Sequence, residues 1–300
     1  MRDFAETSSV FDASEFGKAT RQQFGQAPTK HSHTLHRDPM FTDTGLAALL
    51  DRYPREYVGV YRMGDTPESW ECGRLGQISG EKLVQAVKEG RIWLNLRAAD
   101  QRDPALAEMN QRIFSELKEM IPGFRPFNTD LGLLISSPGA RVFYHLDVPR
   151  VMLFHLRGHK KVWVYPRTEP FVEAHGLECV VSQKTEEDIP YRAEFDADGQ
   201  CFDLQPGQMV HWAQNAPHRI DNNDDLNVSL SIEFMTPMAQ LRANVILANA
   251  WLRDKAGLNS GIESKPNVGW LPKFVLARLI RILEPRHRKP KVLQPTFVLE

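Results

Sequence analysis

The run SSPGARVFYHLDVPRVMLFHLRGHKKVWVYP, residues 136–166, decides how the centre of this chain folds. It holds three short stretches, 140–147, 151–158 and 160–166, in which apolar side chains dominate. Proline and glycine separate them, and both residue types interrupt regular structure. Short stretches rich in Val, Phe, Tyr and Leu and divided by turn residues are typical of β-strands. We therefore expect three consecutive strands here.

The same pattern extends on both sides of this run. Further strand-like stretches are residues 56–63, 91–97, 131–137, 200–213, 218–223 and 226–234. Many short strands at regular intervals, separated by turn signals, indicate an all-β barrel or a double-sheet jelly roll. The sequence thus predicts a mainly β fold, a double-stranded β-helix (jelly roll) with flanking N- and C-terminal helices.

Amphipathic helices precede and follow the predicted strands. The expected helices are residues 42–54, 79–90, 104–122, 239–257 and 270–283. Ser79 is a typical N-cap for the second of them, and Gly90 a typical stop. Residues 1–40 are polar with few periodic apolar positions, so we expect a solvated, partly extended N-terminal arm. A core unit over 41–236 and a C-terminal helical segment with a basic tail over 237–300 complete the division.

The composition is that of an ordinary globular chain. Of its 300 residues, 42% are hydrophobic and 25% charged, which suffices for a sizeable core. A formal net charge of −1 gives no overall electrostatic footprint for nucleic acid. Cys72, Cys179 and Cys201 form no CxxC pair, so neither a disulfide framework nor a structural zinc site is indicated. The N-terminus lacks the order of a signal peptide and no apolar run reaches the ~20 residues of a membrane span, so we expect a cytoplasmic protein.

A candidate metal site lies at the end of the first strand of the quoted run. His145 and Asp147 are two residues apart, and in a strand such residues point to the same face. A second imidazole must come from another strand. His218, which follows a proline at the start of a later stretch, is preferred, and His211 is the alternative. Two histidines and one carboxylate with open coordination positions suit non-haem Fe(II) and O2 chemistry.

A simpler explanation exists for each of these side chains, because an HxD pair alone recurs by chance in many proteins. The three residues would then be core or surface side chains with ordinary hydrogen bonds. For the other histidines considered, structural or solvent-facing roles are the expectation. They are His31, His33, His36, His155, His159 and His175.

The run 136–166 resembles the core of the JmjC and cupin-like family of Fe(II) and 2-oxoglutarate-dependent oxygenases, which includes bacterial cupin-like proteins and an asparaginyl hydroxylase. In that family a strand ends in HxD, a Gly-x-Lys turn follows, and a further strand runs into Tyr-Pro. The later run FDLQPGQMVHWAQNAPHRIDNNDDLNVSLSIEF, residues 202–234, resembles the closing half of the same core. The resemblance implies that His145, Asp147 and His218 are the iron ligands and that the jelly roll is cupin-like.

The resemblance also implies a site for the co-substrate. Lys160 falls on the lysine that pairs with the distal carboxylate of 2-oxoglutarate, and Trp93 and Asn95 correspond to pocket residues on an upstream strand. Two positions depart from the family pattern. Val142 replaces a hydroxyl residue that helps bind 2-oxoglutarate, and Glu233 replaces an amide near the iron.

The expected activity is hydroxylation of a protein side chain or a small molecule. The alternatives are a metal-binding cupin of another reaction type and a non-catalytic cupin that serves as a binding or regulatory module. The resemblance implies a homodimer through the C-terminal helices. We expect residues 270–283 to pack on the barrel or on a second copy, while their basic and apolar side chains leave contact with anionic lipid or nucleic acid as the alternative.

Overall fold

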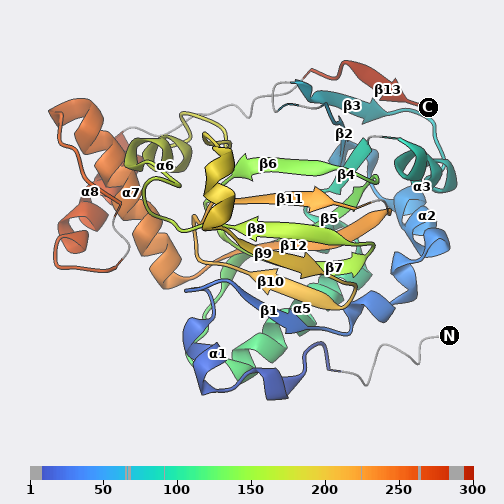
Figure 1. Ribbon diagram of the computed structural model, residues 1–300, viewed down its shortest axis with the longest axis horizontal. Helices are drawn as coiled ribbons and strands as arrows, with labels where there is room; N and C mark the ends of the chain where they lie inside the picture. The colour runs from blue at the N-terminus through green and yellow to red at the C-terminus, as the bar shows by residue number, and fades with distance from the viewer. Residues whose placement is uncertain are drawn as a thin grey trace.

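A computed structural model describes residues 9–64, 66, 69–90, 92–223, 225–262, 265–283 and 294–300. Two β-sheets form its centre, and helices lie around them (Figure 1). In spatial order, the strands of the large sheet are β1 (Thr29–Ser32), β10 (Gln208–His211), β7 (Arg150–Arg157), β12 (Asn227–Met235), β5 (Phe127–Ser136), β4 (Ile92–Leu96), β2 (Val58–Arg62), β3 (Glu71–Leu75) and β13 (Phe297–Leu299). Those of the small sheet are β6 (Arg141–His145), β11 (His218–Asn222), β8 (Lys160–Val164) and β9 (Gln200–Leu204).

The chain passes repeatedly between the two sheets from β5 onward. β5, β7, β10 and β12 belong to the large sheet, and β6, β8, β9 and β11 belong to the small one. Within each sheet these strands pair antiparallel, β5 with β12, β12 with β7 and β7 with β10. The run that was expected to form strands over 200–213 turns at Gly207 (φ 88°), where glycine is favoured, and its halves enter different sheets. The predicted mainly β fold with flanking helices is confirmed.

Period-two alternation decides which side chains face which layer. On β5, Leu131 and Leu133 join the main core, which the large sheet forms with the helices and the N-terminal segment. Leu134 points the other way and packs against a second cluster, where Leu153 of β7 meets Val162 of β8. This second cluster therefore fills the space between the two sheets, and the metal-site candidates lie at one end of it.

Helix α3 begins and ends where its capping residues predict. In α3, the Ser79 side chain accepts a hydrogen bond from the Lys82 amide, and Leu83, Val84 and Val87 are buried. The α-helices are α1 (Lys18–Gln23), α2 (Asp43–Arg52), α3 (Gly80–Glu89), α4 (Ala99–Arg102), α5 (Pro104–Met120), α6 (Ala174–Val181), α7 (Pro237–Ala256) and α8 (Trp270–Leu283). Short 3-10 helices are Ala13–Glu15, Leu35–Arg37, Pro39–Phe41, Arg55–Tyr57 and Ala193–Ala197.

The expectation of a solvated N-terminal arm over 1–40 is wrong for the residues that the structure describes from Ser9 onward. β1 pairs with β10 and extends the large sheet. Phe16 and Phe24 are buried in the main core, and Phe16 stacks on the His31 ring at a centroid distance of 4.7 Å. The few apolar residues of this segment pack against the sheet one at a time and do not recur at a regular interval. The sequence of the segment is otherwise polar, so it gave no signal of burial.

The C-terminal segment contains the two expected helices and one unexpected strand. α7 and α8 project from one end of the sheets (Figure 1), whereas β13 returns to pair in parallel with β3 at the far edge of the large sheet. Most of the predicted basic tail, residues 284–293, lies outside the described residues. Within the described part of the chain, no helix has the length and apolar character required to span a membrane.

Candidate metal centre

His145 reaches the space between the sheets because β6 contains an irregularity. His145 lies opposite His218 on β11, but Val142 lies opposite Ile220, so three steps on β6 match two on β11. Val142 points into the cluster between the sheets. The additional residue on β6 makes His145, three residues later, point to that same side. Bulges of this kind re-aim side chains near functional sites. The strand alternation alone would have placed Val142 and His145 on opposite faces.

Three side chains converge at this end of the small sheet. Potential ligand atoms of His145, Asp147 and His218 all lie within 4.8 Å of one another. The Asp147 carboxylate is 3.2 Å from Nε2 of His218 and 3.9 Å from Nε2 of His145. Nδ1 of His145 contacts the Phe143 carbonyl at 2.7 Å, and Nδ1 of His218 contacts the Ala216 carbonyl at 3.1 Å. A carbonyl can only accept, so Nδ1 carries a proton in each ring and Nε2 is the nitrogen that faces the centre.

The electrostatics of the cluster fit a cation. Burial raises the pKa of Asp147, although His145 nearby opposes that shift. Burial, with a further contribution from His145, holds the pKa of His218 well below its usual range, so His218 is neutral. Oδ2 of Asp147 is buried without a hydrogen-bond partner among the described residues. A buried carboxylate oxygen that faces two imidazole nitrogens and has no hydrogen-bond partner lacks the positive charge that a divalent metal would supply.

Side chains from the loop before β11 hold the Asp147 backbone. Asn215 adopts a left-handed conformation (φ 62°) and donates from Nδ2 to the Asp147 carbonyl at 2.8 Å. Arg242 of α7 donates to Oδ1 of Asn215 at 3.3 Å. Gln214 donates to the Val148 carbonyl at 2.8 Å and to a carbonyl of α7 at 3.1 Å. The sequence reasoning missed these supports, and the one available signal was the AQNAP turn, because asparagine tolerates the left-handed region.

His211, the alternative distal ligand, lies away from the cluster on the large sheet. Its Nε2 is 2.6 Å from the Thr29 hydroxyl, and its Nδ1 accepts from the Gly25 amide at 3.3 Å. Its ring also stacks parallel to His31 at 5.6 Å. His211 therefore anchors the N-terminal segment to β10, as a structural role predicts.

Two other buried histidines, His33 and His155, have backbone partners. Nε2 of His33 contacts the His155 carbonyl at 3.1 Å, and Nε2 of His155 contacts the Gly158 carbonyl at 2.8 Å. His159 and His175 lie at the surface, where they contact the side chains of Gln205 and Cys179. Among the described residues, His145, Asp147 and His218 are the only group of three or more His, Cys, Asp or Glu side chains close enough to share a metal ion.

Lys160 is buried between the sheets. It is 3% exposed and shares its face of β8 with Val162 and Val164, whereas Lys161 points outward and is exposed. Burial lowers the pKa of Lys160 to about 7, and no carboxylate of the described chain counteracts that shift. Burial and the nearby Lys160 charge also lower the pKa of His155 to about 3. Lys160 thus places an uncompensated cation in an apolar interior.

Trp93 and Asn95 lie on β4, further along the large sheet. Trp93 packs in an aromatic cluster with Tyr61 and Trp70, at centroid distances of 5.2 and 5.3 Å. Asn95 lies over Gly132 of β5, its Oδ1 3.4 Å from the position that a Cβ would occupy there. Both side chains are half-buried, and the structure records no contact between either and the metal cluster. Their assignment to the co-substrate site stays a prediction.

Two further acidic residues lie near Asp147. Glu233 is on the inward face of β12, and burial together with the Asp147 and Asp130 charges raises its pKa to about 7. Glu187 precedes β9, and burial together with Asp147 and other nearby acids raises its pKa to about 8. The Glu187 carbonyl accepts a hydrogen bond from the Leu146 amide at 3.1 Å. This bond holds the Glu187 segment beside the end of β6, where the candidate ligands lie. Two carboxyl groups whose pKa values lie near neutrality therefore accompany the three candidate ligands.

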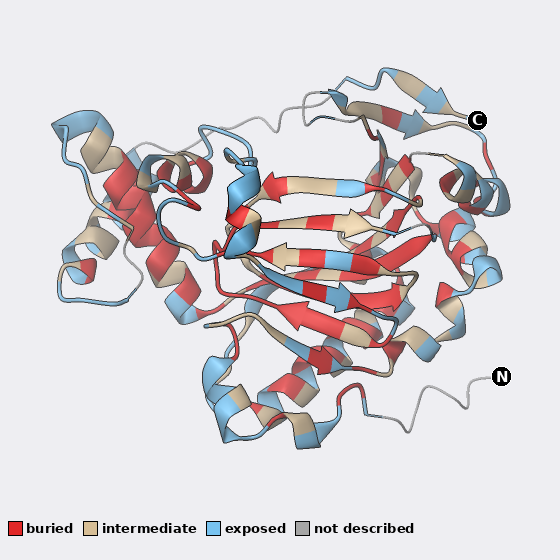
Figure 2. Cartoon of the chain, viewed as in Figure 1, coloured by how far each residue is buried: buried red, intermediate tan, exposed pale blue. Residues whose placement is uncertain are grey.

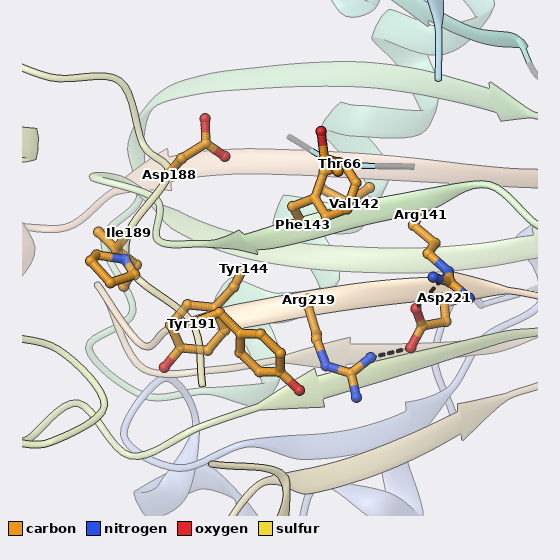
Figure 3. A pocket seen from close by; sticks show the side chains of 11 residues that line it. Thr66, Arg141, Val142, Phe143, Tyr144, Asp188, Ile189, Tyr191, Arg219 and Asp221 are labelled. Atoms are coloured by element: carbon orange, nitrogen blue, oxygen red, sulfur yellow. Dashed lines mark hydrogen bonds and ion pairs between the residues drawn. The ribbon is translucent and has the colours of Figure 1, made fainter. Parts of the chain in front are cut away.

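A cavity of about 860 Å³ adjoins this strand. β6 and β11 form one wall, and residues 188–191 form another (Figure 3). Arg141 lies 3.7 Å from Asp221, which also pairs with Arg219. Asp188 on the opposite wall forms a backbone bridge with His145. The cavity thus lies beside β6, and its walls carry both charged and aromatic side chains.

Comparison with known proteins gives structural neighbours only. No family model matches the chain. The search of curated proteins finds no match either.

The structural neighbours include several structures of the Escherichia coli protein YcfD. The structure described as the ribosomal oxygenase YcfD is 19% identical, with a TM-score of 0.47. A second X-ray structure of YcfD is 17% identical, with a TM-score of 0.49 and coverage of 88% of this chain and 66% of that one. A complex of YcfD with cobalt and 2-oxoglutarate is 18% identical, with a TM-score of 0.44 and coverage of 86% and 64%.

The chain covers 64% of the first of these structures, while 87% of its own length is matched. YcfD in these structures is an oxygenase that is seen with cobalt and 2-oxoglutarate. At TM-scores below 0.5 and identities below 20%, we draw the function of this chain from its own residues.

Proposed function

We propose that this protein is an Fe(II) and 2-oxoglutarate-dependent oxygenase built on a double-stranded β-helix. The observation that carries the proposal is the convergence of His145, Asp147 and His218 around an unpartnered, buried carboxylate oxygen. Two imidazoles and one carboxylate leave coordination positions open, as non-haem iron oxygenases require. The alternation of β5 to β12 between two sheets supports the jelly-roll assignment.

Lys160 supports 2-oxoglutarate as the co-substrate. His218 pairs with Val164 at one end of β8, and Lys160 is four residues away on the same strand and face. At a rise of about 3.3 Å per residue, the two backbone positions are roughly 13 Å apart. The lysine side chain shortens this gap, leaving room for a five-carbon dicarboxylate between ammonium and metal. The distal carboxylate of 2-oxoglutarate would then supply the negative charge that Lys160 lacks.

A substrate that enters the cavity beside β6 would pass this edge strand to reach the metal, because the β11 residues that line the cavity, Arg219 and Asp221, lie on the face of the strand opposite His218. Bound iron and 2-oxoglutarate supply the oxidising chemistry for hydroxylation of a C–H bond. Tyr144 and Asp188 connect the cavity wall to the metal strand, one as the neighbour of His145 and the other through its backbone bridge. The aromatic and charged lining suits a polar organic group, either a protein side chain or a small molecule.

An anaerobic titration of the Fe(II)-loaded protein with 2-oxoglutarate tests both sites at once. We expect the visible charge-transfer band of an iron-chelated 2-oxo acid in the unaltered protein. Lys160→Ala should weaken 2-oxoglutarate binding by at least about tenfold, because a desolvated ion pair is lost. Lys161→Ala is the matched control, since this neighbour points away from the interior. It should leave the titration unchanged.

Each other outcome has a definite meaning. Iron bound stoichiometrically without any band would remove 2-oxoglutarate and favour a metal cupin of another reaction type. Equal binding by the Lys160→Ala and Lys161→Ala variants would remove the assignment of Lys160. A protein that binds no divalent metal would leave the non-catalytic binding module as the remaining candidate.

A further inference from the structure

The exposed apolar surface of this chain is concentrated in α8 and the residues just before it. Six of the eleven large apolar residues exposed in the described chain lie within residues 268–283. They are Val268, Leu271, Val275, Leu279, Ile282 and Leu283. Their exposed fractions run from 48% to 95%, whereas isolated exposed apolar residues elsewhere are ordinary. Figure 2 shows this helix at the end of the molecule that projects away from the sheets.

α8 has two apolar faces, of which its own chain covers one. Ala277 and Ile280 are buried on the inner face, and Ala277 packs with Leu247 and Ala248 of α7. Leu271, Val275 and Leu279 follow one another at intervals of four residues, so they form a stripe on a different side of the helix. A helix that is apolar all round is normally buried on all sides. The outer stripe therefore has the composition of a contact surface.

The charge of α8 has one sign. Lys273, Arg278 and Arg281 are its only ionisable residues, and residues 265–283 contain no acidic side chain. Arg278 and Arg281 are exposed. A complementary surface must therefore combine negative charge with apolar material.

We propose that α8 docks this protein on an anionic lipid surface. The outer stripe of Leu271, Val275 and Leu279 enters the boundary between headgroups and acyl chains, and Arg278 and Arg281 contact the lipid phosphates. This arrangement is that of an interfacial helix lying in the membrane plane. With 14 residues, α8 is about 21 Å long, shorter than the ~30 Å hydrocarbon layer, so it lies on the bilayer.

A second copy of the chain is the competing occupant, and the predicted homodimer would place it there. Two α8 helices packed against each other would bring the exposed Arg278 and Arg281 of both copies together without an acidic residue in either helix. Like charges brought together across an interface disfavour association. Anionic lipid satisfies both the apolar stripe and the charge, so the charge pattern favours it over self-association.

Co-sedimentation of the full chain with vesicles tests this docking. One set of vesicles contains equal parts of phosphatidylglycerol and phosphatidylcholine, and the other contains phosphatidylcholine alone. We expect binding to the anionic vesicles at low salt, weaker binding at high salt, and little binding to the neutral ones. Each of Arg278→Gln and Arg281→Gln should weaken binding about fivefold.

The apolar stripe is tested separately with Leu279→Glu, which should abolish binding. Leu258→Glu is the matched control, because Leu258 is 55% exposed but lies outside α8. Both positions are exposed, so thermal unfolding of both variants should match that of the unaltered chain. Light scattering of the same samples reports the oligomeric state.

Salt-sensitive binding to anionic vesicles that Leu279→Glu removes and Leu258→Glu retains would support the docking. No binding to anionic vesicles at low salt would overturn it. A dimer in solution that Leu279→Glu dissociates, without vesicle binding, would also overturn it and assign the stripe to a second copy. Equal binding by the two glutamate variants would place any lipid contact elsewhere on the chain.

Discussion

Replacing Lys160 with methionine should stabilise the protein and at the same time disable its co-substrate site. Lys160 is buried, and its pKa falls from 10.5 to about 7 because burial disfavours the charged form. The protein without 2-oxoglutarate therefore bears the cost of holding this ammonium group between its sheets. Methionine has an unbranched, flexible side chain of similar length and no charge, so it fills the same space without that cost.

The size of the effect follows from the pKa shift. A lowered lysine pKa means that the unfolded chain binds this proton more tightly than the folded one, so stability rises with pH between about 7 and 10.5. The full shift corresponds to about 5 kcal/mol at 1.36 kcal/mol per unit, and this penalty is present below pH 7. At pH 9 it has fallen to about 2 kcal/mol. The advantage of Lys160→Met should therefore shrink by roughly 3 kcal/mol between pH 6 and pH 9.

Urea unfolding followed by tryptophan fluorescence measures this difference, with metal and 2-oxoglutarate absent from all samples. Lys161→Met is the control, and its free energy of unfolding should change by no more than about 0.5 kcal/mol. A Lys160→Met variant that is less stable than the unaltered chain at pH 6 would refute the reasoning. An advantage of equal size at both pH values would refute it as well, because the penalty would then not come from the lysine charge.

Three further predictions concern the metal centre, the co-substrate and the N-terminal segment. The affinity for 2-oxoglutarate should fall about tenfold per pH unit above pH 7, because neutral Lys160 cannot pair with a carboxylate. Lys160→Arg should remove this pH dependence. Anaerobic titration measures the affinity, and a flat pH profile for the unaltered protein would contradict the prediction. Asp147→Asn should abolish bound iron in elemental analysis. The metal-free variant should unfold at the same temperature as the metal-free unaltered chain or at a higher one, since a buried carboxylate without a partner is removed. Retention of iron would remove Asp147 from the ligand set. Phe16→Ala should lower the free energy of unfolding in urea by about 3–5 kcal/mol, because Phe16 is buried in the main core. A decrease below about 1 kcal/mol would show that residues 9–40 contribute little to the stability of the fold.

Local sequence information was sufficient for most of the strands. The stretches around β5, β7 and β12 alternate or run apolar over several residues, and each is bounded by turn residues. These patterns lie within a few residues of one another, so they can be recognised without knowing the partner strand. Helices α3 and α5 were recognisable for the same reason, since both have a local amphipathic pattern and Ser79 caps α3 from the adjacent residue.

The elements that sequence reasoning misjudged depend on distant partners. β1 is polar on one side and gains its place from pairing with β10, about 180 residues further along the chain. β13 has three residues and exists as a strand because β3 lies beside it. Neither segment contains enough apolar alternation to be recognised, because most of its stabilisation comes from the partner.

The sequence by itself determined the chemical types at the candidate site. His145 and Asp147, two apart at the end of a strand, and a histidine 73 residues later are visible without a structure. The sequence favoured His218 over His211, but only the tertiary structure shows which of them joins the pair, because this depends on which sheet each strand enters. It also decided that Lys160 and not Lys161 is buried, because the pairing of β8 with β9 and β11 sets which face of the strand meets the interior. A period of two makes neighbouring side chains equivalent in the sequence, and only the packed sheets distinguish the inside from the outside.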